Sequence, residues 1–259
     1  MRRLIGTELL KLRTIRLPYG LLAGTAALTA LITGLLASRA GTNAPEGAHM
    51  GLGSSLAPLS TQAGVETIIS ATRFGLLFAT ILGVMIAAGE FRHSTATPTY
   101  LATPNRTRVL IAKIVAAGLV GAVFGLVASG LSTGVGFAYV AAKGFAITVP
   151  ATTVLRYAAG ACLSAALFAS IGAAIGSLIR NQVAGVVGVF VWGLFLESVL
   201  GEVFPSVARW FPYTASVAMA GRTQAGTALP FGGAALLLAA IAVGLSIVAA
   251  RTTVGRDVA

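Results

Sequence analysis

Long apolar runs follow one another along the chain, separated by short polar connections. Each run holds about 18 or more mostly apolar residues, the length that an α-helix needs to cross the hydrocarbon core of a bilayer. The sequence therefore predicts six transmembrane helices, over Pro18–Ala37, Thr67–Ala88, Val109–Ala141, Leu155–Leu178, Val183–Leu200 and Leu229–Ala250. The third run is longer than a bilayer requires, so we expect that helix to tilt, to kink near its glycines or to extend into water.

The segment that precedes the first run is amphipathic. In RRLIGTELLKLRTIR, residues 2–16, helical spacing gathers the apolar side chains on one face, namely Leu4, Ile5, Leu9, Leu12 and Ile15. Such a helix lies in the membrane interface, either as a positively charged anchor or as an elbow helix that docks a partner. A cleaved signal peptide is disfavoured, because the polar lead contains Glu8 and the apolar stretch is too long. We divide the chain into this elbow (1–17), a six-helix bundle (18–250) and a short tail (251–259).

The composition agrees with a membrane protein. Hydrophobic residues make up 56% of the chain, charged residues only 10%, and the mean hydropathy is +0.90. A soluble domain carries about 25% charged residues, so a soluble chain of this composition would lack the polar residues to cover its surface. This excludes a soluble enzyme, a disordered tail and a disulfide scaffold. The predicted fold class is an all-α polytopic membrane protein with six transmembrane helices.

The basic residues favour one side of the membrane. Of 18 Lys and Arg residues, twelve fall on the side of the N-terminus and six on the other. The first set is Arg2, Arg3, Lys11, Arg13, Arg16, Arg92, Arg106, Arg108, Lys113, Arg180, Arg251 and Arg256; the second is Arg39, Arg73, Lys143, Arg156, Arg209 and Arg222. The positive-inside rule then places both termini in the cytoplasm. Because this rule and contact with membrane lipids account for the net charge of +11, we expect no nucleic-acid partner.

The richest polar stretch is GEFRHSTATPTYLATPNRTRVLIAK, residues 89–113, between the second and third predicted helices. Thr97–Pro98 and Thr103–Pro104 are two successive helix-start signals. They predict a short cytoplasmic helix over Pro98–Ala102 and a second helix that runs from Pro104 into the third span. Such a rigid segment is suited to pass force from a soluble partner into the membrane, whereas a solvated loop would only mark the orientation.

A family resemblance rests on this stretch. The order Gly89-Glu90-Phe91-Arg92-His93, then Leu101, Thr103-Pro104, Arg106, Arg108 and Lys113, resembles the first cytoplasmic loop of ABC-transporter permeases of the type-2 exporter superfamily, which includes bacitracin-resistance-type permeases. Ser94 stands where the family usually has Gly. Glu8 and Lys11 are similar to charges of the family's elbow helix, and Arg256-Asp257-Val258 is similar to its basic tail.

The resemblance implies an energy-coupled transporter. A permease of this kind pairs with a second permease chain, homo- or heterodimeric, and a separate cytoplasmic ABC ATPase binds ATP and Mg. The transported compound would be amphipathic or lipid-like, of the drug or peptide-antibiotic class. The residues implied at the ATPase interface are Glu8, Lys11, Glu90, Arg92, His93, Ser94, Thr95, Thr97, Pro98, Tyr100, Leu101, Pro104 and Arg106.

Catalytic and cofactor motifs are missing from the sequence. The chain has no phosphate-binding loop and no Gly-Lys pair, so we expect ATP hydrolysis on the partner and no cofactor in this chain. Its two histidines, His49 and His93, fall on opposite sides of the predicted membrane, and no His/Asp/Glu cluster lies within a span, so neither a metal site nor an intramembrane protease is expected. The chain is therefore predicted not to be an enzyme.

Two other functions stay open. An ion-coupled carrier usually has ionisable groups near the bilayer midplane, but only Arg73 falls inside a predicted span, near its outer end. We expect Arg73 to be an interfacial anchor, with Glu66, Glu197 and Glu202 as possible partners at the same level. The other alternative is a membrane anchor subunit that transports nothing.

Overall fold

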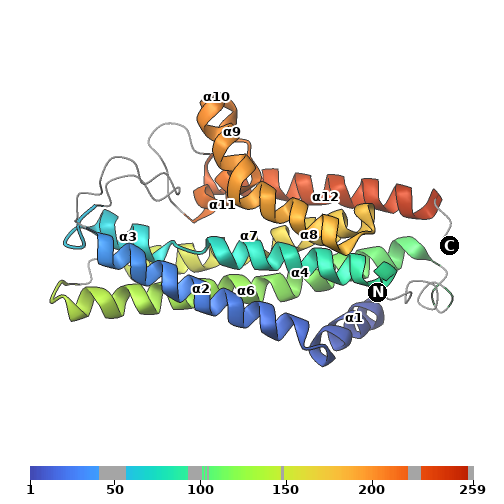
Figure 1. Ribbon diagram of the computed structural model, residues 1–259, viewed down its shortest axis with the longest axis horizontal. Helices are drawn as coiled ribbons and strands as arrows, with labels where there is room; N and C mark the ends of the chain where they lie inside the picture. The colour runs from blue at the N-terminus through green and yellow to red at the C-terminus, as the bar shows by residue number, and fades with distance from the viewer. Residues whose placement is uncertain are drawn as a thin grey trace.

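The computed structural model describes residues 1–40, 57–92, 101, 103, 105–146, 149–220 and 229–255, and the described part is all-α (Figure 1). The helices are α1 (Arg2–Thr14), α2 (Leu17–Arg39), α3 (Gln62–Ile69), α4 (Arg73–Arg92), α6 (Arg106–Ala142), α7 (Ala151–Ile179), α8 (Gln182–Val191), η1 (Trp192–Leu196), α9 (Glu197–Val203), α10 (Pro205–Ala208), α11 (Pro212–Met219) and α12 (Phe231–Gly255). Six segments of the described part of the chain are long and apolar enough to cross a membrane, and they coincide with the predicted ones. The predicted all-α polytopic fold is confirmed.

The centre of the bundle is formed by α4, α6 and α7, which pack on one another. α2 lies against α6 and α4, α8 lies against α4, and α12 lies against α7 (Figure 1). Figure 1 also shows α1 and the last turns of α12 at the same end of the bundle, which we name the α1 end, while α3 lies at the opposite end, the α3 end. The ends of α4 and α7 and the starts of α6 and α8 also lie at the α1 end.

Small residues let the central helices approach closely. A Cβ atom at Gly121 or Gly125 of α6 would collide with the backbone of α7, and one at Gly172 or Gly176 of α7 would collide with the backbone of α4. Lipid is as apolar as a leucine side chain, so membrane helices associate through such close packing. These two Gly-x-x-x-Gly pairs therefore serve packing within the chain.

The second predicted span differs from the structure. A break at residues 70–72 divides it into α3 and α4, and Arg73 is the first residue of α4 and not an internal one. A carbonyl that loses its helical partner inside a membrane needs another donor. The Ser132 hydroxyl of α6 donates to the Ile69 carbonyl at 2.7 Å, and the Ser70 hydroxyl donates to the Thr67 carbonyl at 3.0 Å. These side chains stabilise the break.

The helix that leads into the third predicted span starts slightly later than expected. α6 begins at Arg106, two residues after the predicted start at Pro104. The reason is a cap: the Asn105 side chain accepts a hydrogen bond from the Arg108 amide at 3.0 Å and so satisfies the first turn. The other predicted helix of this connection covers Pro98–Ala102. Of these five residues, only Leu101 belongs to the part of the chain that the structure describes.

Candidate functional site: a charge cluster at the α1 end

Four charged side chains from three helices meet at the α1 end. Glu8 and Lys11 come from α1, Glu90 from the last turn of α4, and Lys113 from the second turn of α6. The Lys113 Nζ atom lies 2.8 Å from Glu8 Oε2 and 2.7 Å from Glu90 Oε1. The Lys11 Nζ atom lies 2.7 Å from Glu8 Oε1 and 3.2 Å from Glu90 Oε1. Each lysine thus bridges both carboxylates, and the four charges sum to zero. We name these four residues the charge cluster.

Three of the four side chains of the charge cluster have little exposed surface. The side chains of Lys113, Glu8 and Glu90 are 6%, 7% and 13% exposed, whereas that of Lys11 is 41% exposed. A buried charge is tolerated only when it is paired and hydrogen-bonded, and removal of one partner then costs about 3–5 kcal/mol. The charge cluster therefore fixes α1 against α4 and α6.

The electrostatics of α1 reflect this pairing. Burial alone would raise the pKa of Glu8, but the charge of Lys113 and the hydrogen bonds from Lys11 and Lys113 outweigh it, so that the pKa of Glu8 is lowered. Burial alone would lower the pKa of Lys11, but its hydrogen bond to Glu8 and the negative charge of Glu90 raise that pKa. Both shifts favour the charged forms, so the ion pairs persist at neutral pH.

The helical period of α1 explains why Glu8 points into the charge cluster. Glu8 and Leu12 stand one turn apart on the face of α1 that packs on α6, and both are buried. The amphipathic face predicted from apolar residues alone thus also contains a carboxylate. Lys113 is the last charged residue of α6 and lies near the start of that helix, where its ammonium group donates to the Glu8 carboxylate of α1.

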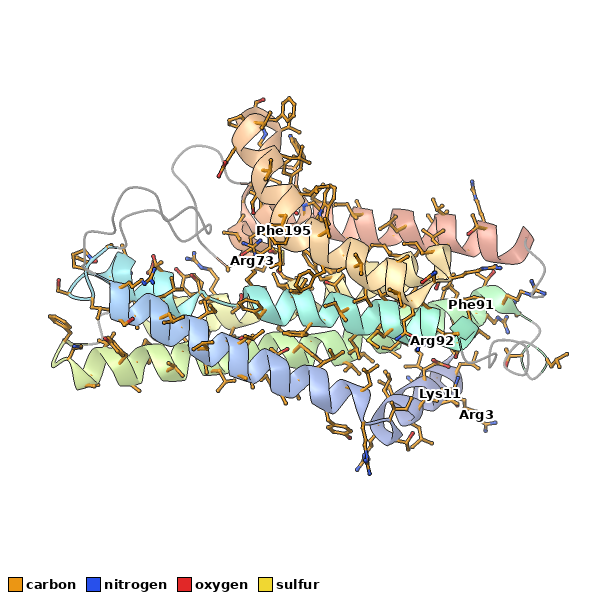
Figure 2. All side chains as sticks on the ribbon, viewed as in Figure 1. Arg3, Lys11, Arg73, Phe91, Arg92 and Phe195 are labelled. Carbon is orange, nitrogen blue, oxygen red and sulfur yellow. The ribbon has the colours of Figure 1, made fainter. Side chains whose placement is uncertain are left out.

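The two residues that follow Glu90 contact other helices. The guanidinium of Arg180, at the end of α7, lies 5.0 Å from the centre of the Phe91 ring, a distance typical of a cation–π contact. The Arg92 Nη1 atom donates to the Gln182 side chain at the start of α8, at 3.4 Å. Three consecutive residues at the end of α4 therefore contact α1 and α6, then α7, then α8. Figure 2 shows Lys11, Phe91 and Arg92 together at this end of the bundle.

The structure brings together only part of the implied ATPase interface. Glu8, Lys11 and Glu90 pair within the chain, Arg92 contacts Gln182, Leu101 is 79% exposed, and Arg106 begins α6. The other residues lie outside the described ones, namely His93, Ser94, Thr95, Thr97, Pro98, Tyr100 and Pro104. The set of implied site residues omitted Lys113 and Arg180. Lys113 had a signal, since a lysine inside an apolar run needs a partner.

A second polar group lies at a distance from the charge cluster, around Arg73 (Figure 2). The Arg73 Nη2 atom donates to the Gly193 carbonyl at 2.5 Å, and the guanidinium lies 4.4 Å from the centre of the Tyr213 ring. Glu197, one of the predicted partners of Arg73, interacts with it electrostatically. Glu66, another predicted partner, accepts a hydrogen bond from Gln62 at 2.7 Å.

The Glu197 carboxylate has partners on both oxygens. Its Oε1 atom accepts from the Thr214 amide at 2.8 Å, in the first turn of α11, and its Oε2 atom accepts from Trp192 Nε1 at 3.2 Å. A carboxylate at a helix N-terminus is favoured by the free amides and by the helix dipole. Arg73, Tyr213 and Glu197 therefore tie the start of α4 to η1, α9 and α11. We name Arg73, Trp192, Glu197 and Tyr213 the Arg73 site.

Neither site has the composition of a metal centre. Within the described ranges no three His, Cys, Asp or Glu residues come close enough together to hold a metal ion. Comparison with protein-family models and with curated protein sequences finds no match for this chain.

Proposed function

We propose that the chain is the membrane-spanning permease subunit of an ATP-driven ABC exporter, with the α1 end in the cytoplasm. The observation that carries the proposal is the triple contact made by Glu90, Phe91 and Arg92 at the end of α4. The connection from α4 to α6 begins at this point, and its sequence resembles the loop that receives an ATPase in type-2 exporters. Six membrane-crossing helices are consistent with this role.

The proposed mechanism is mechanical. A partner ATPase that binds ATP and Mg would push on the connection between α4 and α6. Because three of the four side chains have little exposed surface and each lysine bridges both carboxylates, a displacement there would move α1, α4 and α6 together. Phe91 and Arg92 would carry the same displacement to α7 and α8. The cargo would cross at a seam with a second permease chain and would be amphipathic or lipid-like.

The contacts also refine the roles implied for the site residues. In this proposal Glu8 and Glu90 hold the helices of this chain together and do not contact the ATPase, since their carboxylates bind lysines of the same chain. Direct contact with the ATPase falls to exposed residues, of which Leu101 and Arg92 are described. The charge cluster gives an ion-coupled carrier no support, because it lies at the α1 end of the bundle. Arg73 and Glu197, in contrast, lie within the apolar segments Gln62–Arg92 and Gln182–Val203, so the ion-coupled carrier stays the alternative function.

Site-specific photo-crosslinking tests the proposal. A photo-reactive amino acid replaces Leu101 in the full chain, expressed in its native membranes, and the captured protein is identified by mass spectrometry. We expect a protein with an ATP-binding motif that hydrolyses ATP when it is purified with this chain. The matched control replaces Phe145, which is also exposed but follows α6 at the α3 end, and should capture no ATPase. Capture of an ATPase from Phe145 alone would refute the assignment.

A charge reversal tests the coupling itself. Arg92→Glu should leave the chain folded, because Arg92 is exposed, but it should reduce the ATP-driven change in distance between spin labels on α2 and α8. Arg209→Glu is the control, since Arg209 is also exposed and lies beyond α9. An ATP response that survives Arg92→Glu unchanged would contradict a transmitting role for this residue.

A further inference from the structure

An apolar cavity of about 340 Å³ lies between α4, α7, α8 and α12. Its walls are formed mainly by aliphatic side chains, among them Leu76, Ile171, Ile175, Ile241 and Leu245. Pockets that bind small molecules have volumes of about 300–1,000 Å³ and the same predominance of apolar walls. The size and chemistry of this cavity are therefore those of a binding site.

The cavity is elongated along the bundle. It follows α7 from Phe168 to Ile179, and eleven residues of α-helix span about 16 Å at 1.5 Å per residue. On the facing side it follows α8 and η1 from Gly185 to Gly193. A long, narrow apolar space of this kind fits an extended hydrocarbon chain better than a compact ring system.

One end of the cavity is polar. All four residues of the Arg73 site line it. The Nη2 atom of Arg73 is engaged by the Gly193 carbonyl, and both oxygens of Glu197 are engaged by Thr214 and Trp192. The Nε atom of Arg73 is buried and has no hydrogen-bond partner among the described residues. A buried donor without an acceptor is costly, so this N–H group would gain from an oxygen acceptor. Because the Nε atom has almost no accessible surface, the guanidinium must turn towards the cavity for the two to meet.

We propose that this cavity binds a single-chain lipid, with the acyl chain between α7, α8 and α12 and a carboxyl or ester oxygen accepting a hydrogen bond from Arg73 Nε. The hydrocarbon chain alone gives little preference, because the bilayer is equally apolar. The hydrogen bond to Arg73 supplies the selectivity, and the polar end can be a carboxyl or an ester group because both carry an oxygen that accepts it. The site lies within one chain, so this inference does not rest on the proposed ABC function.

Photo-labelling with lipids tests the proposal. The purified full chain in nanodiscs, without any ATPase, is exposed to two photo-reactive probes that share an acyl carbonyl: a fatty acid and a lysophosphatidylcholine. Labels should map to residues that line the cavity on α7, α8 and α12. The relative yield of the two probes distinguishes a free acid from a lysolipid as the source. Labels spread evenly over lipid-facing residues would overturn the proposal.

A substitution that fills the cavity, paired with the same substitution at an exposed position, provides a matched test. Leu245→Trp places a larger side chain in the wall contributed by α12 and should reduce cavity labelling at least several-fold. Leu236→Trp introduces the same side chain at an exposed position of α12 and should leave the labelling unchanged. If Leu245→Trp fails to fold, Ile241→Phe fills less of the same wall and should give a partial reduction. Unchanged labelling in a folded, filled variant would overturn the proposal.

The polar end has its own variant. Arg73→Lys keeps the positive charge but removes the Nε atom, so it should weaken cavity labelling by both probes while the chain stays folded by gel filtration and thermal unfolding. Equal labelling of the folded Arg73→Lys variant and the native chain would show that the hydrogen bond is not used. Because no ATPase is present, failure here is distinct from failure of the crosslinking at Leu101.

Discussion

The charge cluster and the Arg73 site solve the same problem in different ways. Both hold charges at helix ends in an apolar protein. In the charge cluster, each lysine binds two carboxylates, and two of the four side chains, those of Glu8 and Lys113, are buried. At the Arg73 site, the guanidinium binds a backbone carbonyl and an aromatic ring, and Glu197 binds an amide and an indole.

This difference suits the charge cluster to a structural role and the Arg73 site to binding a ligand. Charges that bind one another leave little hydrogen-bonding capacity for anything else, so the charge cluster stabilises the packing of α1. Charges that bind neutral groups leave the Nε atom of Arg73 without a partner among the described residues, beside a cavity. We therefore expect substitutions in the charge cluster to change stability most, and substitutions at the Arg73 site to change ligand binding more than stability.

The largest expected effect follows from loss of Lys113. Lys113→Met leaves Glu8 and Glu90 with only the partly exposed Lys11 between them, so it should lower the free energy of unfolding by up to about 3–5 kcal/mol. Thermal unfolding in detergent, followed by fluorescence, measures the change. Lys143→Met is the control, because Lys143 is exposed just after the other end of α6. Equal unfolding temperatures for the two variants would contradict a structural role for the charge cluster.

Loss of Glu197 should have an intermediate effect. Glu197→Ala removes the acceptor of the half-buried Thr214 amide and of Trp192 Nε1, and an unsatisfied donor away from water costs about 1–3 kcal/mol. The same unfolding measurement applies, with Glu202→Ala as the control because Glu202 is exposed in the same helix. A Glu197→Ala variant as stable as Glu202→Ala would show that the start of α11 does not depend on this carboxylate.

A smaller effect is expected at the surface. Arg92→Gln loses one long hydrogen bond between exposed side chains, so it should change the free energy of unfolding by less than about 1 kcal/mol. A loss of unfolding free energy as large as that of Lys113→Met would mean that Arg92 stabilises the fold. Arg92 could not then be assigned a role specific to coupling.

The smallest effect is expected from pH in the neutral range. The pKa of Glu8 is lowered from 4.5, so its stabilisation is present above pH 4.5 and is lost as pH falls through the lower folded-state value. The pKa of Lys11 is raised from 10.5, so its stabilisation is present below pH 10.5 and is lost as pH rises through the higher folded-state value. Spin labels on α1 and α6 should therefore keep one distance between these limits. A change near pH 7 would contradict the pairing.

The sequence predicts the spans well and the local irregularities poorly. A helix that crosses lipid must be long and apolar, so hydropathy alone locates all six segments. The break before Arg73 is not visible in hydropathy, because the donor that stabilises it, Ser132, is 63 residues away. The π-helical turn η1 also has a distant contact, because the Gly193 carbonyl accepts from Arg73, which is 120 residues away in the sequence.

For the charge cluster, too, the sequence predicts the residues but not their contacts. The sequence singles out Glu8, Lys11 and Glu90, because charges are scarce and these three lie in recognisable polar segments. It does not show that they bind one another, since Glu8 and Lys113 are 105 residues apart. Their pairing is a property of how α1 folds back on α6. The spacing of Glu8 and Leu12 on one face is the only local hint of it.

The central claim, that the α1 end faces the cytoplasm, is tested most directly by the sidedness of two cysteines. Cys162→Ser removes the only cysteine of the chain, and Leu101→Cys or Phe145→Cys then adds one exposed thiol at the α1 end or the α3 end. A membrane-impermeant maleimide should label Leu101→Cys only in inside-out vesicles and Phe145→Cys only in intact cells. The reverse pattern would contradict the account, because a cytoplasmic ATPase could not then reach the end of α4.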